Sequence, residues 1–149
     1  MNKIRVSKEF HFEMSHALLN YDGPCKNIHG HSYKLVVTLI GEAMNDNNSP
    51  KNGMLIDFTE LKRLVKSLIL EHFDHAFLVN RKADISSFYS AKEMFDKMLV
   101  LDYQPTCENI LIDIVSRLHK GFPENLNVHN VRLYETTTSY AEWFSTDNK

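Results

Sequence analysis

The N-terminal part of the chain alternates apolar and polar side chains in a way that strongly favours a β-strand. Every odd position from Arg5 to Ser15 is polar, and apolar or aromatic side chains occupy most even positions from Ile4 to His16. Successive side chains of a strand point to opposite faces of a sheet, so this pattern predicts one buried and one solvated face. A second alternation runs from about Ile28 to Gly41, on the phase of Tyr33, Leu35, Val37 and Leu39. The turn formers Asp22-Gly23-Pro24 lie between the two runs, so these two strands can pair as an antiparallel hairpin.

Two helices and a closing hairpin complete the predicted architecture. Asp57 and Glu60 have the spacing of a capping box, and the stripe behind them predicts a helix that ends near His72: Leu61, Leu64, Val65, Leu68 and Ile69. Thr106 is the expected N-cap of a second helix with the apolar face Ile110, Leu111, Ile114, Val115 and Leu118. The segments "VHNVRLYE" and "YAEWF" flank the turn "TTTS" and predict a C-terminal hairpin.

This order of elements predicts an α+β fold. The expected core is an antiparallel four-stranded sheet with both helices on one face. The segment from Arg81 to Gln104 has no clear pattern, and "SAKEMFDKMLVLD" within it is compatible with a short helix or a packed excursion.

Composition bounds the possible functions. A chain of 149 residues with 43% hydrophobic and 24% charged residues fits one globular domain spanning residues 1–149. The net charge is −2, and the sequence has no run of five or more like charges. Both features argue against a nucleic-acid or anionic-membrane surface as the main function. We expect no membrane helix, a cytoplasmic location, and reduced thiols at Cys25 and Cys107.

The stretch "CKNIHGH" brings a thiol and two imidazoles into seven positions. On a strand, His29 and His31 point to the same face, and an antiparallel hairpin would bring His16 beside them. Three imidazoles suit a zinc ion whose last position stays open to water or substrate. Cys25 could instead be a fourth ligand of a closed structural site, and a His-x-His pair also arises by chance in a chain with eight histidines.

Three acidic positions are further candidates. Asp74 beside His75 could tune an imidazole for proton transfer, although helix capping also explains the pair. Glu108 lies in the first turn of the second predicted helix, where simple complementation of the helix dipole is an adequate explanation. Glu135 has the phase of Val131 and would point towards the apolar side, where an unpaired carboxylate is costly and therefore suggests ligand binding.

Taken together, these segments resemble the 6-pyruvoyl-tetrahydropterin synthase family, which includes the bacterial 6-carboxy-tetrahydropterin synthases. The resemblance spans nearly the whole chain, through six motifs in the family's order: "FEMSH", "CKNIHGH", "MLIDF", "DH", "PTCEN" and "YETTTSYAEW". It departs from the family in a longer segment between His75 and Pro105, and in residues around an intact Asp74–His75 pair. The implied architecture is the tunnelling fold, in which subunits join their sheets into an oligomeric barrel, trimer-based and expected to be a hexamer, with the site between subunits.

The resemblance also implies a role for each candidate residue. Zinc would be bound by His16, His29 and His31. Cys25 would be the catalytic proton-transfer residue, working with Asp74 and His75. The pterin would be anchored by Glu135, with Glu108 and Thr106 contributing nearby.

The spacing between Cys25 and His29 bears on which reaction is expected. Its three-residue gap is similar to that of the queuosine-pathway members, whereas the animal-type members have a longer gap. A folate-pathway variant has glutamate in place of the cysteine. The resemblance therefore implies conversion of 7,8-dihydroneopterin triphosphate to 6-carboxy-5,6,7,8-tetrahydropterin, with release of acetaldehyde and triphosphate. The alternatives are 6-pyruvoyl-tetrahydropterin formation and a non-catalytic, zinc-stabilised pterin-binding module.

Overall fold

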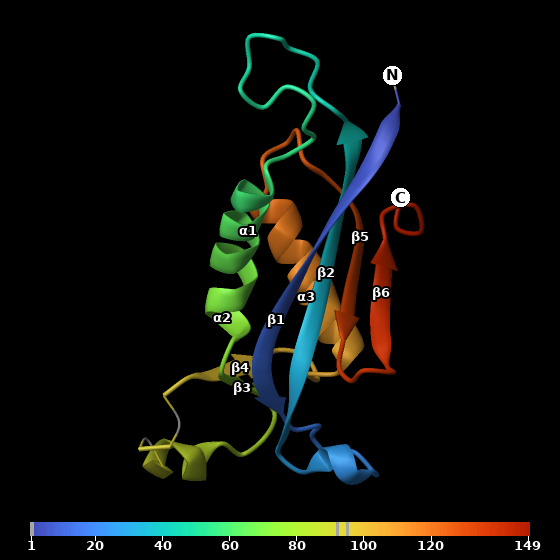
Figure 1. The fold of residues 1–149 in the computed structure, drawn as a ribbon. Helices are drawn as coiled ribbons and strands as arrows, with labels where there is room; N and C mark the ends of the chain where they lie inside the picture. The colour runs from blue at the N-terminus through green and yellow to red at the C-terminus, as the bar shows by residue number, and fades with distance from the viewer. Residues whose placement is uncertain (1, 92, 95) are drawn as a thin grey trace.

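A long antiparallel hairpin forms the centre of the molecule. The computed structural model describes residues 2–91, 93–94 and 96–149 (Figure 1). Strands β1 (Lys3–His16) and β2 (His29–Glu42) pair along their whole lengths, with Lys3 opposite Glu42 and His16 opposite His29. The predicted antiparallel hairpin, with the end of the first strand beside the start of the second, is therefore confirmed.

The sheet has six strands, where the sequence predicted four. The expected antiparallel set is present as β1, β2, β5 (Asn127–Tyr134) and β6 (Tyr140–Phe144). Two short strands, β3 (Ala76–Asn80) and β4 (Met98–Leu101), extend it beyond β1 in the order β4-β3-β1-β2-β5-β6. Both added pairings are parallel, so the sheet is mixed rather than purely antiparallel.

Both predicted helical segments cover the same face of the sheet (Figure 1). The first comprises α1 (Phe58–Val65), a π-helical turn (Lys66–Leu70) and α2 (Glu71–Phe73), and it ends one residue beyond the predicted His72. Asp57 caps it by accepting a hydrogen bond from the Thr59 amide at 2.7 Å. Helix α3 (Cys107–Gly121) begins after its predicted N-cap Thr106, whose hydroxyl accepts from the Asn109 amide at 3.3 Å.

The core lies between the sheet and these helices. It takes the predicted stripes almost unchanged, including Tyr33, Leu35, Leu61, Ile69 and Ile114, which are fully buried. Phe73 at the end of α2 is also fully buried and stacks on Phe12 of β1 at a centroid distance of 6.5 Å. This contact fixes the end of α2 against β1, next to the start of β3.

The segment from Arg81 to Gln104 contains a short 3₁₀ helix (Ser86–Ala91) and then β4. The expectation of a helix or packed excursion for "SAKEMFDKMLVLD" is thus wrong for its last part, which is strand, and Lys92 and Phe95 lie outside the described residues. Across the part of the chain that the structure describes, no helix is long and apolar enough to cross a membrane.

Candidate active site

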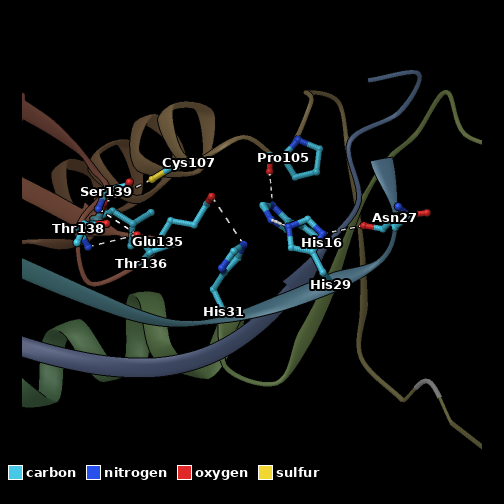
Figure 2. A network of polar contacts seen from close by, with 11 residues as sticks. His16, Asn27, His29, His31, Pro105, Cys107, Glu135, Thr136, Thr138 and Ser139 are labelled. Atoms are coloured by element: carbon cyan, nitrogen blue, oxygen red, sulfur yellow. Dashed lines mark hydrogen bonds and ion pairs between the residues drawn. The ribbon is translucent and has the colours of Figure 1, made fainter. Parts of the chain in front are cut away.

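The register of the central hairpin brings three histidines together at one end of the sheet. His16 ends β1 directly opposite His29, and His31 follows two residues later on the same face. Each residue offers a ring nitrogen, and these three nitrogens lie within 4.8 Å of one another. Figure 2 shows the three rings pointing towards a common centre. The predicted convergence of His16, His29 and His31 is confirmed, and the group could hold a metal ion.

Two backbone carbonyls determine which ring nitrogens face that centre. The Nδ1 atom of His16 lies 2.7 Å from the Pro105 oxygen, and Nδ1 of His29 lies 2.7 Å from the Asn27 oxygen (Figure 2). A carbonyl only accepts, so both Nδ1 atoms carry the proton and both Nε2 atoms present lone pairs. These Nε2 atoms are 3.1 Å apart. Two facing lone pairs at this distance are stabilised by a shared cation, and a carbonyl bound to the far nitrogen is typical of metal-ligating histidines.

Burial favours the neutral, metal-binding form of two of the rings, those of His16 and His31. His16 is only 2% exposed, and burial lowers its pKa below the usual 6.5. Burial also lowers the pKa of His31. The Nε2 atom of His31 is buried and has no hydrogen-bond partner among the described residues. An unpaired buried nitrogen is costly, and a metal ion between the three rings would satisfy it.

Glu135 extends the group along the helix-covered side of the sheet. Its Oε1 atom lies 3.7 Å from Nε2 of His31, too far for a hydrogen bond, and its side chain is 24% exposed. Its backbone amide donates to the Ser139 oxygen, which closes the turn between β5 and β6. Figure 2 shows that the carboxylate points towards His31, on the side of the sheet that its phase with Val131 predicted.

Five of the predicted residues line one cavity. This cavity of about 360 Å³ is bounded by His16, Cys25, Thr106, Glu108 and Glu135. Glu108 is exposed at the start of α3. Cys25 lies in the β1–β2 loop, where its carbonyl accepts from the Leu18 amide at 3.0 Å. Among the described residues, the group that could hold a metal comprises the three histidines without Cys25.

Asp74 and His75 lie apart from this cavity. Asp74 Oδ1 and His75 Nδ1 are 3.0 Å apart, although neighbouring side chains rarely meet directly. The contact depends on His75, whose φ of 59° lies in the left-handed region. His75 lines a separate cavity of about 330 Å³ with Glu13, Ser32 and His31. Within one chain, the structure thus forms the Asp–His pair but does not bring it to Cys25.

Several residues that support the site were not predicted. Gln104 binds both the amide and the carbonyl of Leu19 with its side chain, which holds the loop before Cys25. Tyr33 is fully buried with its ring centroid 5.6 Å from that of His31, and burial raises the pKa of its phenol. In the sequence, only Gln104 could have been noticed, because its side chain is polar. Tyr33 looks like an ordinary core aromatic.

A second thiol, Cys107, also lines the cavity. Its Sγ donates to the Leu133 oxygen at 3.4 Å, and burial raises its pKa to about 11. Cys107 therefore remains a protonated thiol near neutral pH. Both cysteines are free, as expected for reduced thiols.

The comparisons with known proteins identify the class of protein. The family model described as 6-pyruvoyl tetrahydropterin synthase matches residues 5–145, so the chain belongs to this family. Among its relatives, the 6-carboxy-5,6,7,8-tetrahydropterin synthase of Haemophilus influenzae is 37% identical over 141 residues, which is 93% of this chain and 97% of that protein. The Synechocystis protein of the same name is 32% identical over 94% of this chain and 92% of its own length.

Solved structures support the same fold. An uncharacterized protein from Wolinella succinogenes has a TM-score of 0.79 at 20% identity, covering 97% of this chain and 99% of that chain. The 6-pyruvoyl tetrahydropterin synthase of Caenorhabditis elegans has a TM-score of 0.69 at 24% identity and covers 97% of both chains. At these identities the likeness concerns the fold alone.

Proposed function

We propose that this protein is a zinc-dependent lyase that converts 7,8-dihydroneopterin triphosphate to 6-carboxy-5,6,7,8-tetrahydropterin, releasing acetaldehyde and triphosphate. The observation that carries the proposal is the cavity lined by Cys25, Glu135 and His16, a member of the three-histidine group. Two relatives named 6-carboxy-5,6,7,8-tetrahydropterin synthase support the carboxy product. So does the three-residue gap between Cys25 and His29.

In this proposal zinc is bound by His16, His29 and His31. The donor set fits, because three imidazole nitrogens lie within 4.8 Å of one another and would leave an open position for substrate. Bound zinc would act as a Lewis acid that acidifies the hydroxyl groups of the substrate side chain. Three imidazoles also accept other divalent ions, so metal analysis decides which one is present.

The pterin ring would be bound by Glu135. A carboxylate can accept two parallel hydrogen bonds from the amino-pyrimidine edge, as it does from a guanidinium. Thr106 and Glu108 line the same cavity and would contact the ring or its substituents. With the ring held there, the substrate side chain would extend towards the three-histidine group, whose member His16 lines the same cavity.

Proton transfer would then involve both sides of the substrate. Cys25, as thiolate, would exchange protons at the side-chain carbons, while Asp74 and His75 would pass protons from the opposite side. Because His75 and Cys25 line different cavities within one chain, we assign the completed site to an interface between subunits. The corresponding assembly is a homo-oligomeric barrel built from trimers, with the hexamer as the expected state.

The proposal is tested by incubating the metal-loaded protein with 7,8-dihydroneopterin triphosphate and identifying the pterin product by mass spectrometry. A 6-carboxy product supports the assignment. A 6-pyruvoyl product would place the chain with the other activity of its family. Unchanged substrate would contradict both and favour a pterin-binding role.

A further inference from the structure

The peptide unit that joins Asp74 to His75 has an unusual conformation. His75 has a φ of 59°, a left-handed value that costs a residue with a side chain about 1 kcal/mol or more. Such a conformation persists only where the surrounding contacts determine it. The direct contact between Asp74 Oδ1 and His75 Nδ1 at 3.0 Å depends on this geometry.

Strand β1 holds one side of this peptide unit. The His75 amide donates to the Glu13 carbonyl at 2.6 Å, and the Glu13 amide donates to Oδ1 of Asp74 at 3.0 Å. The nitrogen of the Asp74–His75 peptide bond and the Asp74 carboxylate are therefore both bound to a single β1 residue.

Lys97 holds the other side. Its Nζ donates to the Asp74 carbonyl at 2.8 Å and to the Glu71 carbonyl at 2.7 Å. The Asp74 oxygen belongs to the same peptide bond whose nitrogen is held by Glu13, so both polar atoms of this bond are fixed. Carbonyls at the end of a helix lack intrahelical partners and carry the negative end of the helix dipole, which favours a lysine there.

The position of Lys97 is itself well determined. It lies one residue before β4, and its carbonyl accepts from the Phe77 amide of β3 at 2.9 Å. The strand that follows the Asp–His pair therefore anchors the residue that holds the pair. This gives the Arg81–Gln104 segment, whose role the sequence did not predict, a contact with the candidate catalytic machinery.

We propose that Lys97 is a positioning residue that holds Asp74 and His75 in their proton-transfer geometry by binding the peptide oxygen between them. The inference rests on the role given to this pair in the proposed function. Lys97 lies on the cavity that also contains Lys62 and Lys66, two exposed lysines of the first helical segment. Among the described residues the side-chain ammonium of Lys66 makes no hydrogen bond or ion pair, so Lys66 provides a control with the same charge in the same cavity.

The test compares Lys97→Met, Lys97→Arg and Lys66→Met in the full-length, metal-loaded protein. Misplacing a catalytic group by about 1 Å can cost about 10²-fold, so Lys97→Met should lower kcat by roughly 10- to 100-fold while KM changes little. Lys97→Arg keeps a cationic donor and should restore most of kcat, and Lys66→Met should match the wild type. Circular dichroism and thermal melting verify that each variant is folded.

Hydrogen–deuterium exchange of the peptide spanning residues 71–77 gives a readout that is independent of turnover. Exchange should accelerate in Lys97→Met and stay at the wild-type rate in Lys66→Met. Unchanged kcat in a folded Lys97→Met protein overturns the inference, and so does equal loss in Lys97→Met and Lys66→Met. A wild-type protein that forms no product contradicts the proposed function instead, and the exchange experiment still decides whether Lys97 holds the pair.

Discussion

Removing the metal should lower the thermal stability of the protein by an amount that the site geometry allows us to estimate. The nitrogens of the three proposed ligands come within 4.8 Å of one another through long-range strand pairing, which the unfolded chain lacks. An ion that binds only the folded state stabilises it by about 2.7 kcal/mol when its free concentration is 100 times Kd. The facing Nε2 atoms of His16 and His29, 3.1 Å apart, add to the effect because they repel when no cation lies between them.

The expected shift in melting temperature follows from the size of the chain. For a chain of 149 residues, 1 kcal/mol corresponds to roughly 2–4 °C, so 2.7 kcal/mol corresponds to about 5–11 °C. The measurement is a thermal melt of the zinc-loaded protein and of the same protein after chelation, with zinc content determined by mass spectrometry.

Two variants make the result specific to the histidine cluster. His31→Ala should abolish the response to zinc, because it removes one of three ligands. His11→Ala is the matched control, since His11 is exposed on β1, and it should respond like the wild type. A zinc-loaded wild type that melts at the same temperature after chelation, or a His31→Ala protein that responds fully, would refute the reasoning.

Three further predictions concern single residues. Cys25→Ala should retain zinc and lose about 10²–10⁴-fold in kcat, as expected for a proton-transfer group. If zinc content fell in step with activity, Cys25 would be a ligand instead. Glu135→Gln should raise KM by roughly 10- to 100-fold in steady-state kinetics, because a charge-assisted contact contributes about 1.5–3 kcal/mol. An unchanged KM would exclude Glu135 as the pterin anchor. Burial, aided by the Arg117 charge, lowers the pKa of His72 below 6.5, so the unfolded chain binds this proton more readily. The free energy of unfolding should therefore fall as the pH drops below about 6.5. Urea unfolding at several pH values should show a smaller fall in His72→Gln than in the wild type, and equal falls would contradict the assignment.

The sequence predicted the parts of the fold that have a strong hydrophobic period. The two long strands have fourteen residues each and alternate over much of their length, and the helix stripes are continuous, so their faces and caps followed directly. The same reasoning brought His16, His29 and His31 together, because strand phase and hairpin pairing are both readable from local sequence. Their role as metal ligands and the single domain over residues 1–149 stay predictions.

The missed features depend on long-range contacts. Strands β3 and β4 have only five and four residues and no polar alternation, and their parallel pairing links segments that are distant in the chain. The Pro105 carbonyl that orients His16 is a backbone group, which no side-chain pattern reveals. That His75 and Cys25 line different cavities likewise follows from tertiary structure, which local sequence patterns do not reveal.

The most direct test of the central claim is the ratio of acetaldehyde to triphosphate released from 7,8-dihydroneopterin triphosphate by the zinc-loaded protein. The proposed reaction releases both from the same substrate molecule, so equal amounts are expected. Triphosphate without acetaldehyde would show elimination without carbon–carbon cleavage and would contradict the assignment as a 6-carboxy-tetrahydropterin synthase.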